Sequence, residues 1–244
     1  MGAKDGPDAF RTTMRRICAS DARLGVDLRY RLLISIRRAM ICGRKLRIVD
    51  AGNIAPELTL EDGHARLTAA VFSALNAGAV PFVVGGGNDQ SYPNASALLD
   101  LCNQQQSYNR ILSAESNHFI DRSLLVINID AHLDVRPLKN NQVHSGSPFR
   151  LMLQDERFGA CRGNFVEFAA QGAQCSLEHA AYVKQHGGTV MWLDDMNSDP
   201  VTAFQSLLQA TDKDAIFVSF DLDAVRGSDA PVKFNLIYNH RRRA

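Results

Sequence analysis

The chain has 244 residues, of which 45% are hydrophobic and 22% are charged, and its formal net charge is +1. These values fit one globular domain with a sizeable core, and they give no reason to expect nucleic acid or an anionic membrane as a partner. No apolar run is long enough to span a bilayer, and the N-terminus has no apolar signal core. The five cysteines are scattered and odd in number, which favours reduced thiols in a cytoplasmic protein.

The first third of the chain shows helical spacing before it shows strands. The spacing of Phe10, Met14 and Ile17 predicts a first helix, and residues 24–40 are predicted as a second. Residues 46–49 are predicted as a short strand. Thr59 is a plausible N-cap for a further helix that ends near Gly78.

An apolar strand is predicted over residues 80–84, followed by the turn Gly85-Gly86-Gly87-Asn88-Asp89 and a helix over residues 91–102. This order of elements is shared with phosphate-binding loops. The turn lacks the third spaced glycine of a dinucleotide fingerprint and the Gly-Lys-Ser/Thr of a P-loop, so both are rejected. The three glycines instead let the backbone turn sharply and present Asn88 and Asp89 at a strand end.

The most informative stretch covers residues 124–134, where an apolar run ends in Asp130, His132 and Asp134. Alternate residues of extended backbone share a face, so the three side chains can converge on one point. Taken alone, the triplet is as well explained by a polar turn after a strand. A second apolar run ends in the same way at Asp221 and Asp223, and the two together predict a metal site.

Strands are also predicted over residues 164–170, 189–193 and 215–221, and helices from about Pro148 and over residues 176–185 and 201–209. Strands that alternate with helices indicate a parallel sheet covered on both faces. We therefore expect an α/β protein, a three-layer α/β/α sandwich with a mainly parallel sheet. Ligands of such sheets bind at the carboxyl ends of the strands, where the candidate residues lie.

Carboxylates with one imidazole form a hard, oxygen-rich site that suits Mn²⁺ better than thiol-seeking metals. Four carboxylates carry too much negative charge for one divalent ion, but they suit two ions that share bridging ligands. A two-metal site lowers the pKa of a bound water and so supplies hydroxide at neutral pH. The pattern therefore points to hydrolysis of an unreactive carbon centre.

At these residues the chain resembles the ureohydrolase family of arginase, agmatinase and formimidoylglutamase. The resemblance rests on three motifs: Gly85-Gly86-Gly87-Asn88-Asp89, Asp130-Ala-His132-Leu-Asp134 and Ser219-Phe-Asp221-Leu-Asp223. The triple glycine and His144-Ser-Gly-Ser-Pro-Phe-Arg150 are most similar to the formimidoylglutamase branch. The resemblance extends over residues 1–231, which we expect to form a ureohydrolase-like domain, and leaves residues 232–244 as an atypical tail.

The resemblance implies a role for each matching residue. Asp130 and Asp221 would bridge two Mn²⁺ ions, His132 and Asp223 would bind one ion, and Asp134 would bind the other. Catalytic roles fall to Asp130 and to His144, the proton-handling or substrate-contacting histidine. Arg150 would pair with a substrate carboxylate, or equally would cap its helix. Four further histidines have no motif context and are expected on the surface or in helices: His64, His118, His179 and His186.

Three departures from the family pattern bear on activity. Asn88 stands where most members have a metal-binding histidine, so one metal position should be weak unless Asp89 substitutes for it. The chain begins at an element that normally follows a first strand. Beyond Pro231 it lacks the family's strand-helix portion, with the acidic residue that contacts the substrate's amidine group. The sequence therefore resembles a family member truncated at both ends.

The resemblance implies a Mn²⁺-dependent hydrolase that converts N-formimino-L-glutamate to L-glutamate and formamide. An arginase-type or agmatinase-type guanidino hydrolase is the alternative within the family. A catalytically silent homologue that binds metal or a partner subunit is the alternative outside it. A homo-oligomer is left open, since an open sheet edge invites association.

Overall fold

The computed structural model describes residues 5–16, 20–21, 26–27, 37–41, 44–55, 57, 59–112, 123–196, 199–226 and 228–229. The chain divides into two compact units. The first comprises Met1–Gly63 with Phe82–Gly87, and the second comprises His64–Pro81 with Asn88–Ala244. Every residue predicted for the metal site belongs to the second unit. The tail predicted over residues 232–244 lies outside the described residues.

The first unit contains one helix and two antiparallel strand pairs among its described residues. Helix α1 is Gly6–Arg16; β1 (Ser20–Asp21) pairs with β2 (Val26–Asp27), and β3 (Arg37–Ile41) with β4 (Arg44–Ile48). The helix predicted over residues 24–40 is therefore wrong wherever that stretch is described. The spacing of apolar residues in a short run does not distinguish a helix from a strand. In the structure, the backbone of β3 forms its hydrogen bonds with β4 and not within a helix.

The strand predicted over residues 46–49 exists as β4, but it lies in this antiparallel pair and not in the parallel sheet. The strand predicted over residues 80–84 is absent from the structure, which has irregular backbone there. Val80 is 94% exposed and Phe82 is 80% exposed. An extended segment without a hydrogen-bonded neighbour strand leaves its backbone groups to water, so apolar composition alone does not make a strand.

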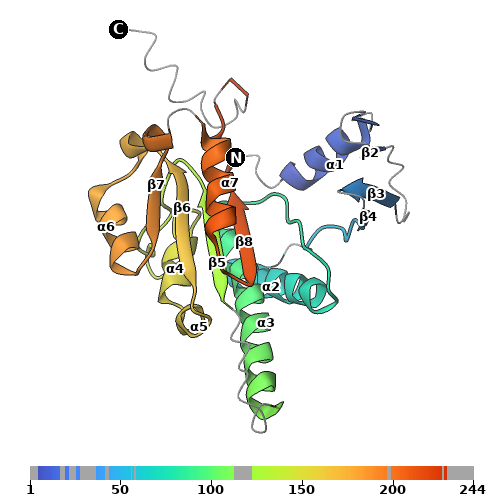
Figure 1. Cartoon of the computed structure of the whole chain (residues 1–244), viewed down its shortest axis with the longest axis horizontal. Coiled ribbons are helices and arrows are strands. Elements are labelled where there is room, and N and C mark those ends of the chain that lie inside the picture. Colours follow the sequence, from blue (N-terminus) through green and yellow to red (C-terminus); the bar gives the residue numbers. More distant parts are fainter. Residues whose placement is uncertain are drawn as a thin grey trace. The chain divides into compact units, whose positions relative to one another are not determined.

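The second unit is built on four parallel strands, in the order β7-β6-β5-β8 among the described residues (Figure 1). Their bounds are β5 Leu124–Ile129, β6 Asn164–Ala170, β7 Thr189–Trp192 and β8 Ala215–Phe220. These four strands confirm the predictions for the corresponding stretches. Strand β5 is paired on both sides and its residues Leu124 to Asn128 are buried, as expected for a mostly apolar run in a parallel sheet.

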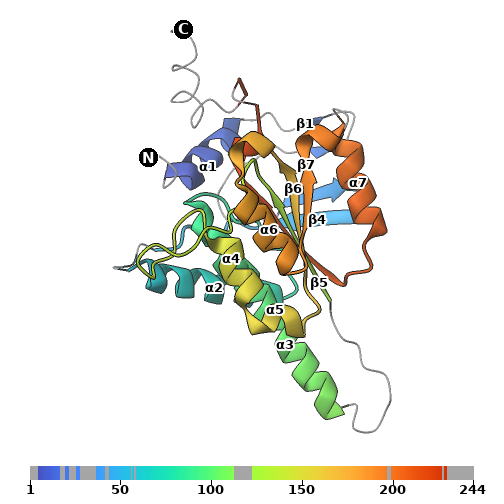
Figure 2. The ribbon, with the colours of Figure 1, turned by 90° about the vertical axis from the view of Figure 1, so that its left-hand side faces the viewer.

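Helices lie on both faces of this sheet, which confirms the predicted layer arrangement (Figure 2). One face carries α3 (Ser91–Leu112), α4 (Pro148–Gln154), α5 (Glu156–Ala160) and α6 (Leu177–Gln185), and the other carries α7 (Pro200–Ala210). The larger core cluster, on the first face, includes Leu99, Val126 and Phe149. The smaller cluster joins Leu125, Ile127 and Phe168 to Phe204 of α7.

Helix α2 (Leu60–Asn76) begins and ends as its sequence predicts. The Oγ1 atom of Thr59 accepts a hydrogen bond from the backbone N of Asp62 at 3.1 Å, and Gly78 takes a left-handed φ of 76° just beyond the helix. Leu67 and Val71 pack with Ala97 of α3. Among the described residues, no helix has both the length and the apolar character needed to cross a membrane.

Short 3₁₀ turns join the main elements at Asn88–Gln90, Gly172–Gln174, Leu193–Met196 and Leu222–Ala224. The first and the last of these turns carry candidate metal ligands. The conformation of these two turns therefore decides where the side chains of the candidate ligands point.

Candidate metal centre

The carboxyl ends of β5 and β8 bring two of the predicted carboxylates next to each other. Ile129 and Phe220 are register partners, and the backbone N of Asp221 donates to the backbone O of Ile129 at 2.9 Å. Asp130 and Asp221 are therefore the next residues on adjacent strands. Asp130 is fully buried. This adjacency is what the two sequence motifs predicted.

Three predicted ligands converge closely. The Nδ1 atom of His132 lies 3.3 Å from Oδ1 of Asp130 and 3.3 Å from Oδ2 of Asp223. One ligand atom from each of these residues lies within 4.8 Å of the other two. Asp130 Oδ1 also accepts from the backbone N of His132 at 2.7 Å, so the turn after β5 holds the carboxylate. The three side chains have the spacing of a site for one cation.

Asp134 joins this group through Asn88. The Nδ2 atom of Asn88 donates to Oδ2 of Asp134 at 2.5 Å and lies 3.5 Å from Oδ2 of Asp130. The Oδ1 atom of Asn88 accepts from the hydroxyl of Ser91 at 2.6 Å, which orients the amide. Asn88 therefore turns its amide nitrogen toward the carboxylates, and not the amide oxygen through which it could bind a metal. The backbone of Asp134 has a left-handed φ of 43°, a conformation that non-glycine residues adopt mainly at turns and functional sites.

Asp89 does not point toward these residues. Its Oδ2 atom lies 2.8 Å from Nε2 of His64 on α2, and both side chains are largely buried. The substitution of Asp89 for the missing histidine ligand, considered from sequence, therefore requires this contact to break. His64 is thus a partly buried helix residue with a carboxylate partner. This contact was not predicted, because His64 belongs to no recognisable sequence motif.

The charges of the site favour a cation. Burial, and then the nearby Asp130 carboxylate, raises the pKa of Asp134 to about 7. Burial also raises the pKa of Asp130, with the Asp223 charge adding to the rise against the hydrogen bonds from His132. Hydrogen bonds to Asp130 and then Asp223 raise the pKa of His132 to about 10. A divalent ion would relieve the repulsion between carboxylates and displace the imidazole proton, so these residues fit a metal.

Of the two residues predicted to contact substrate, His144 lies in the loop that follows Asp134 and Arg150 lies in α4. His144 Nε2 is 3.0 Å from the backbone O of Pro137, and His144 Nδ1 accepts from the backbone N of Gly146 at 3.2 Å. Arg150 donates through Nε to the backbone O of Val135 at 2.8 Å, and its guanidinium lies 3.8 Å from the centre of the Tyr182 ring. Both side chains form hydrogen bonds with the backbone of this loop. Their roles in substrate binding remain predictions.

Sequence reasoning missed a row of polar residues beneath the ligands. Asn128, Glu167 and Ser219 each interrupt an apolar strand, and all three are buried. They are register partners across β6, β5 and β8. The signal that would have found them is a polar or acidic residue inside an otherwise buried strand, since such residues are rarely buried without a partner.

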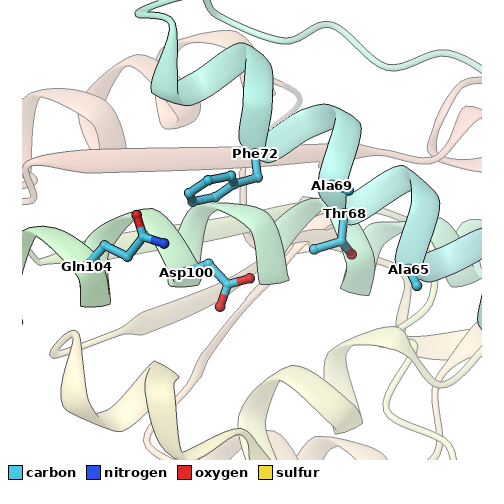
Figure 3. Close-up of a pocket in the computed structure, with 6 residues that line it drawn as sticks. All are labelled: Ala65, Thr68, Ala69, Phe72, Asp100 and Gln104. Atoms are coloured by element: carbon cyan, nitrogen blue, oxygen red, sulfur yellow. The ribbon is translucent and has the colours of Figure 1, made fainter.

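A separate groove of about 410 Å³ lies between α2 and α3 (Figure 3). Its lining combines small and apolar side chains with two polar ones: Ala65, Thr68, Ala69, Phe72, Asp100 and Gln104. Asp100 lies 2.5 Å from Arg157, which also binds Asp155. None of the candidate metal ligands lines this groove, so it is a different site from the carboxylate cluster.

The sequence over residues 1–232 matches the model of a protein family described as the arginase family. The chain therefore belongs to the arginase family. The parallel sheet, and the carboxylates at the ends of two of its strands, are the features that the motif resemblance implied.

Several similar proteins are named formimidoylglutamase or formiminoglutamase. Formimidoylglutamase from Paraburkholderia xenovorans (strain LB400) is 28% identical over 189 residues, which are 75% of this chain and 56% of that protein. A crystal structure of Trypanosoma cruzi formiminoglutamase with Mn²⁺₂ is 40% identical with a TM-score of 0.71, and the match covers 95% of this chain and 66% of that one. A variant of that protein in which histidine replaces one asparagine, also with Mn²⁺₂, gives a TM-score of 0.72 at 39% identity. The chain thus spans little more than half the length of the first relative and about two thirds of these solved chains.

Proposed function

We propose that the protein is a Mn²⁺-dependent hydrolase of linear amidines that converts N-formimino-L-glutamate to L-glutamate and formamide. The observation that carries this proposal is the convergence of Asp130, His132 and Asp223 at the carboxyl ends of β5 and β8. Membership of the arginase family supports the reaction class. Relatives named formimidoylglutamase, and the solved formiminoglutamase with Mn²⁺₂, support the substrate and the metal.

The proposed ligand set follows the residues already brought together. Asp130 and Asp221 are proposed to be shared between two ions, His132 and Asp223 to bind one ion, and Asp134 with Asn88 to hold the other. Bound Mn²⁺ lowers the pKa of a water molecule and polarises a nearby carbon–nitrogen bond. Burial of Asp130 and Asp134 keeps competing water away from the carboxylates, which strengthens their hold on a cation.

The loop after Asp134 and the start of α4 are proposed to bind the substrate. His144 would handle a proton or contact the amidine, for which one ring nitrogen must leave its backbone partner in the loop. Arg150 would bind a substrate carboxylate through its terminal nitrogens, because its Nε already donates to Val135. A planar guanidinium suits a carboxylate because it can donate two parallel hydrogen bonds.

A second candidate function is metal binding without turnover. The orientation of Asn88 favours it, because Nδ2 faces Asp134 and an amide nitrogen with its hydrogens is no metal ligand. In that case the site would hold one ion firmly, at Asp130, His132 and Asp223. The two candidates differ in catalytic activity, and both require Mn²⁺ to bind.

The test is an assay of the purified chain in excess Mn²⁺, with release of glutamate and formamide from N-formimino-L-glutamate as the readout. Arginine and agmatine serve as comparison substrates for the guanidino hydrolase alternative. Turnover of N-formimino-L-glutamate that is lost in Asp130→Asn supports the proposal. Mn²⁺ binding by calorimetry without turnover supports the second candidate, and preference for arginine or agmatine overturns the substrate assignment.

A further inference from the structure

A buried polar row crosses the sheet one step below the candidate ligands. Asn128 of β5 is the register partner of Glu167 on β6 and of Ser219 on β8. Register partners on parallel strands share a face, so the three side chains lie side by side. Asn128 and Glu167 are fully buried and Ser219 is 8% exposed. Asp130 lies two residues beyond Asn128, and Asp221 two residues beyond Ser219, on the same faces of their strands.

Asn128 links this row to Asp130. Its Nδ2 atom donates to Oε1 of Glu167 at 3.1 Å and to Oε2 at 3.2 Å, and it lies 3.3 Å from Oδ2 of Asp130. The other oxygen, Oδ1 of Asp130, accepts a hydrogen bond from the backbone N of His132 in the turn after β5. The side chain of Asp130 is therefore held at both oxygens, once by its own turn and once by Asn128.

The other end of the row reaches a second candidate ligand. The hydroxyls of Ser219 and Ser91 are 2.9 Å apart, and Ser91 donates to Oδ1 of Asn88 at 2.6 Å. The row thus contacts the candidate centre directly at Asp130 and reaches Asn88 through Ser91. A structural role in strand pairing alone would not require side chains that reach the ligands at both ends.

We propose that Glu167 is a positioning residue for the metal centre, which holds the amide of Asn128 so that this amide fixes Oδ2 of Asp130. This inference rests on the proposed binding of Mn²⁺. Glu167 acts through Asn128 and is not itself a ligand. Groups that hydrogen-bond to metal ligands orient those ligands, and their loss lowers metal affinity.

The surroundings of Glu167 agree with this role. Burial, and then the charge of Asp130, raises the pKa of Glu167 well above its usual value, which favours the neutral carboxyl beside the acidic cluster. A neutral carboxyl offers Asn128 an acceptor without adding another charge next to Asp130. A glutamine side chain has the same shape as glutamate and also has an oxygen that accepts a hydrogen bond. A methionine side chain has a similar length, but its sulfur is only a weak acceptor.

The experiment measures the affinity of the metal-free chain for Mn²⁺ by calorimetric titration in three variants. Glu167→Met should weaken Mn²⁺ binding by roughly 10- to 100-fold, the range found when a group supporting a metal ligand is removed. Glu167→Gln should bind close to the unvaried chain. Glu178→Met, which changes an exposed glutamate on α6, is the matched control and should not alter affinity. Thermal unfolding of each metal-free variant separates folding from metal affinity.

Two results would overturn the inference: Mn²⁺ affinity unchanged in Glu167→Met, or affinity lowered equally in Glu167→Gln. If Glu167→Met fails to fold, Asn128→Leu decides, because it removes the link and leaves Glu167 in place. Weakened binding in that variant supports the proposal, and unchanged binding overturns it. Failure of the unvaried chain to bind Mn²⁺ would overturn the proposed function first, and this inference with it.

Discussion

The amide of Asn88 donates from Nδ2 to Oδ2 of Asp134 at 2.5 Å, in a place where the family pattern leads one to expect a metal-ligating imidazole. This contact gives Asp134 a neutral hydrogen-bond donor. An ion shared by Asp134 and Asn88 must therefore displace this hydrogen bond and turn the amide, and both changes oppose binding.

Replacement of Asn88 by histidine should strengthen the weaker of the two metal positions. An imidazole nitrogen is a better ligand for Mn²⁺ than an amide, and it has no oxygen for Ser91 to hold. Calorimetric titration of Asn88→His should show a second Mn²⁺ equivalent bound more tightly than in the unvaried chain. Gln104→His, in an exposed part of α3, is the control. Two equally tight equivalents in the unvaried chain would contradict this prediction.

Replacement of Asp130 by asparagine should abolish tight Mn²⁺ binding, because Asp130 is the buried carboxylate to which His132 and the Asn128 amide are both directed. The loss should exceed the 10- to 100-fold range typical of supporting residues, so we expect more than about 100-fold. Calorimetry with Mn²⁺ measures it. Asp194→Asn, at an exposed aspartate, should leave the affinity unchanged. Retention of tight binding in Asp130→Asn would show that the ion lies elsewhere.

Replacement of Gly85 by alanine should destabilise the first unit. Gly85 has a φ of 101°, and an added Cβ atom would collide with the ring of Pro7. The backbone strain alone costs about 1–2 kcal/mol, and the collision adds to it. Gly63→Ala is the matched control, because Gly63 lies inside α2 with open space around it, and there alanine should stabilise by about 0.5–1 kcal/mol. Chemical denaturation monitored by circular dichroism compares the two, and equal effects would contradict the prediction.

Acid should weaken the ion pair between Asp155, the N-cap of α5, and Arg157. Burial acts to raise the pKa of Asp155, but the hydrogen bonds and charge of Arg157 outweigh it, so the pKa lies below its ordinary value of 3.8. A carboxylate with a lowered folded-state pKa contributes stability above its unfolded-state pKa, and this contribution is lost as the pH falls through the folded-state value. The loss should therefore occur below about pH 4.

Asp155→Asn tests this, because asparagine caps α5 as well as aspartate does but carries no charge for Arg157. We expect the variant to be less stable than the unvaried chain by about 1 kcal/mol at pH 7. The difference should shrink as the pH falls below the pKa of Asp155. Asp212→Asn, at a 92% exposed side chain, should show no such convergence. A difference that is constant from pH 7 to pH 3 would be inconsistent with the assignment.

The sequence by itself determined the four parallel strands and most of the candidate metal ligands. Apolar runs identified β5 and β8, and alternate acidic residues at their ends placed Asp130 and Asp221 at the carboxyl end of the sheet. The N-cap at Thr59 was an equally local signal, because its side chain accepts the bond from a backbone N–H only three residues further on.

Only the tertiary structure decided the rest, because the deciding partners are distant in sequence. Residues 80–84 are as apolar as β5 but have irregular backbone, since a strand requires a neighbour to accept its hydrogen bonds. The amide of Asn88 is oriented by Ser91 and Asp134, and Asp89 is held by His64. The hydrogen bonds across β5, β6 and β8 depend on how distant parts of the chain pack together, so the spacing of residues in the sequence does not predict them.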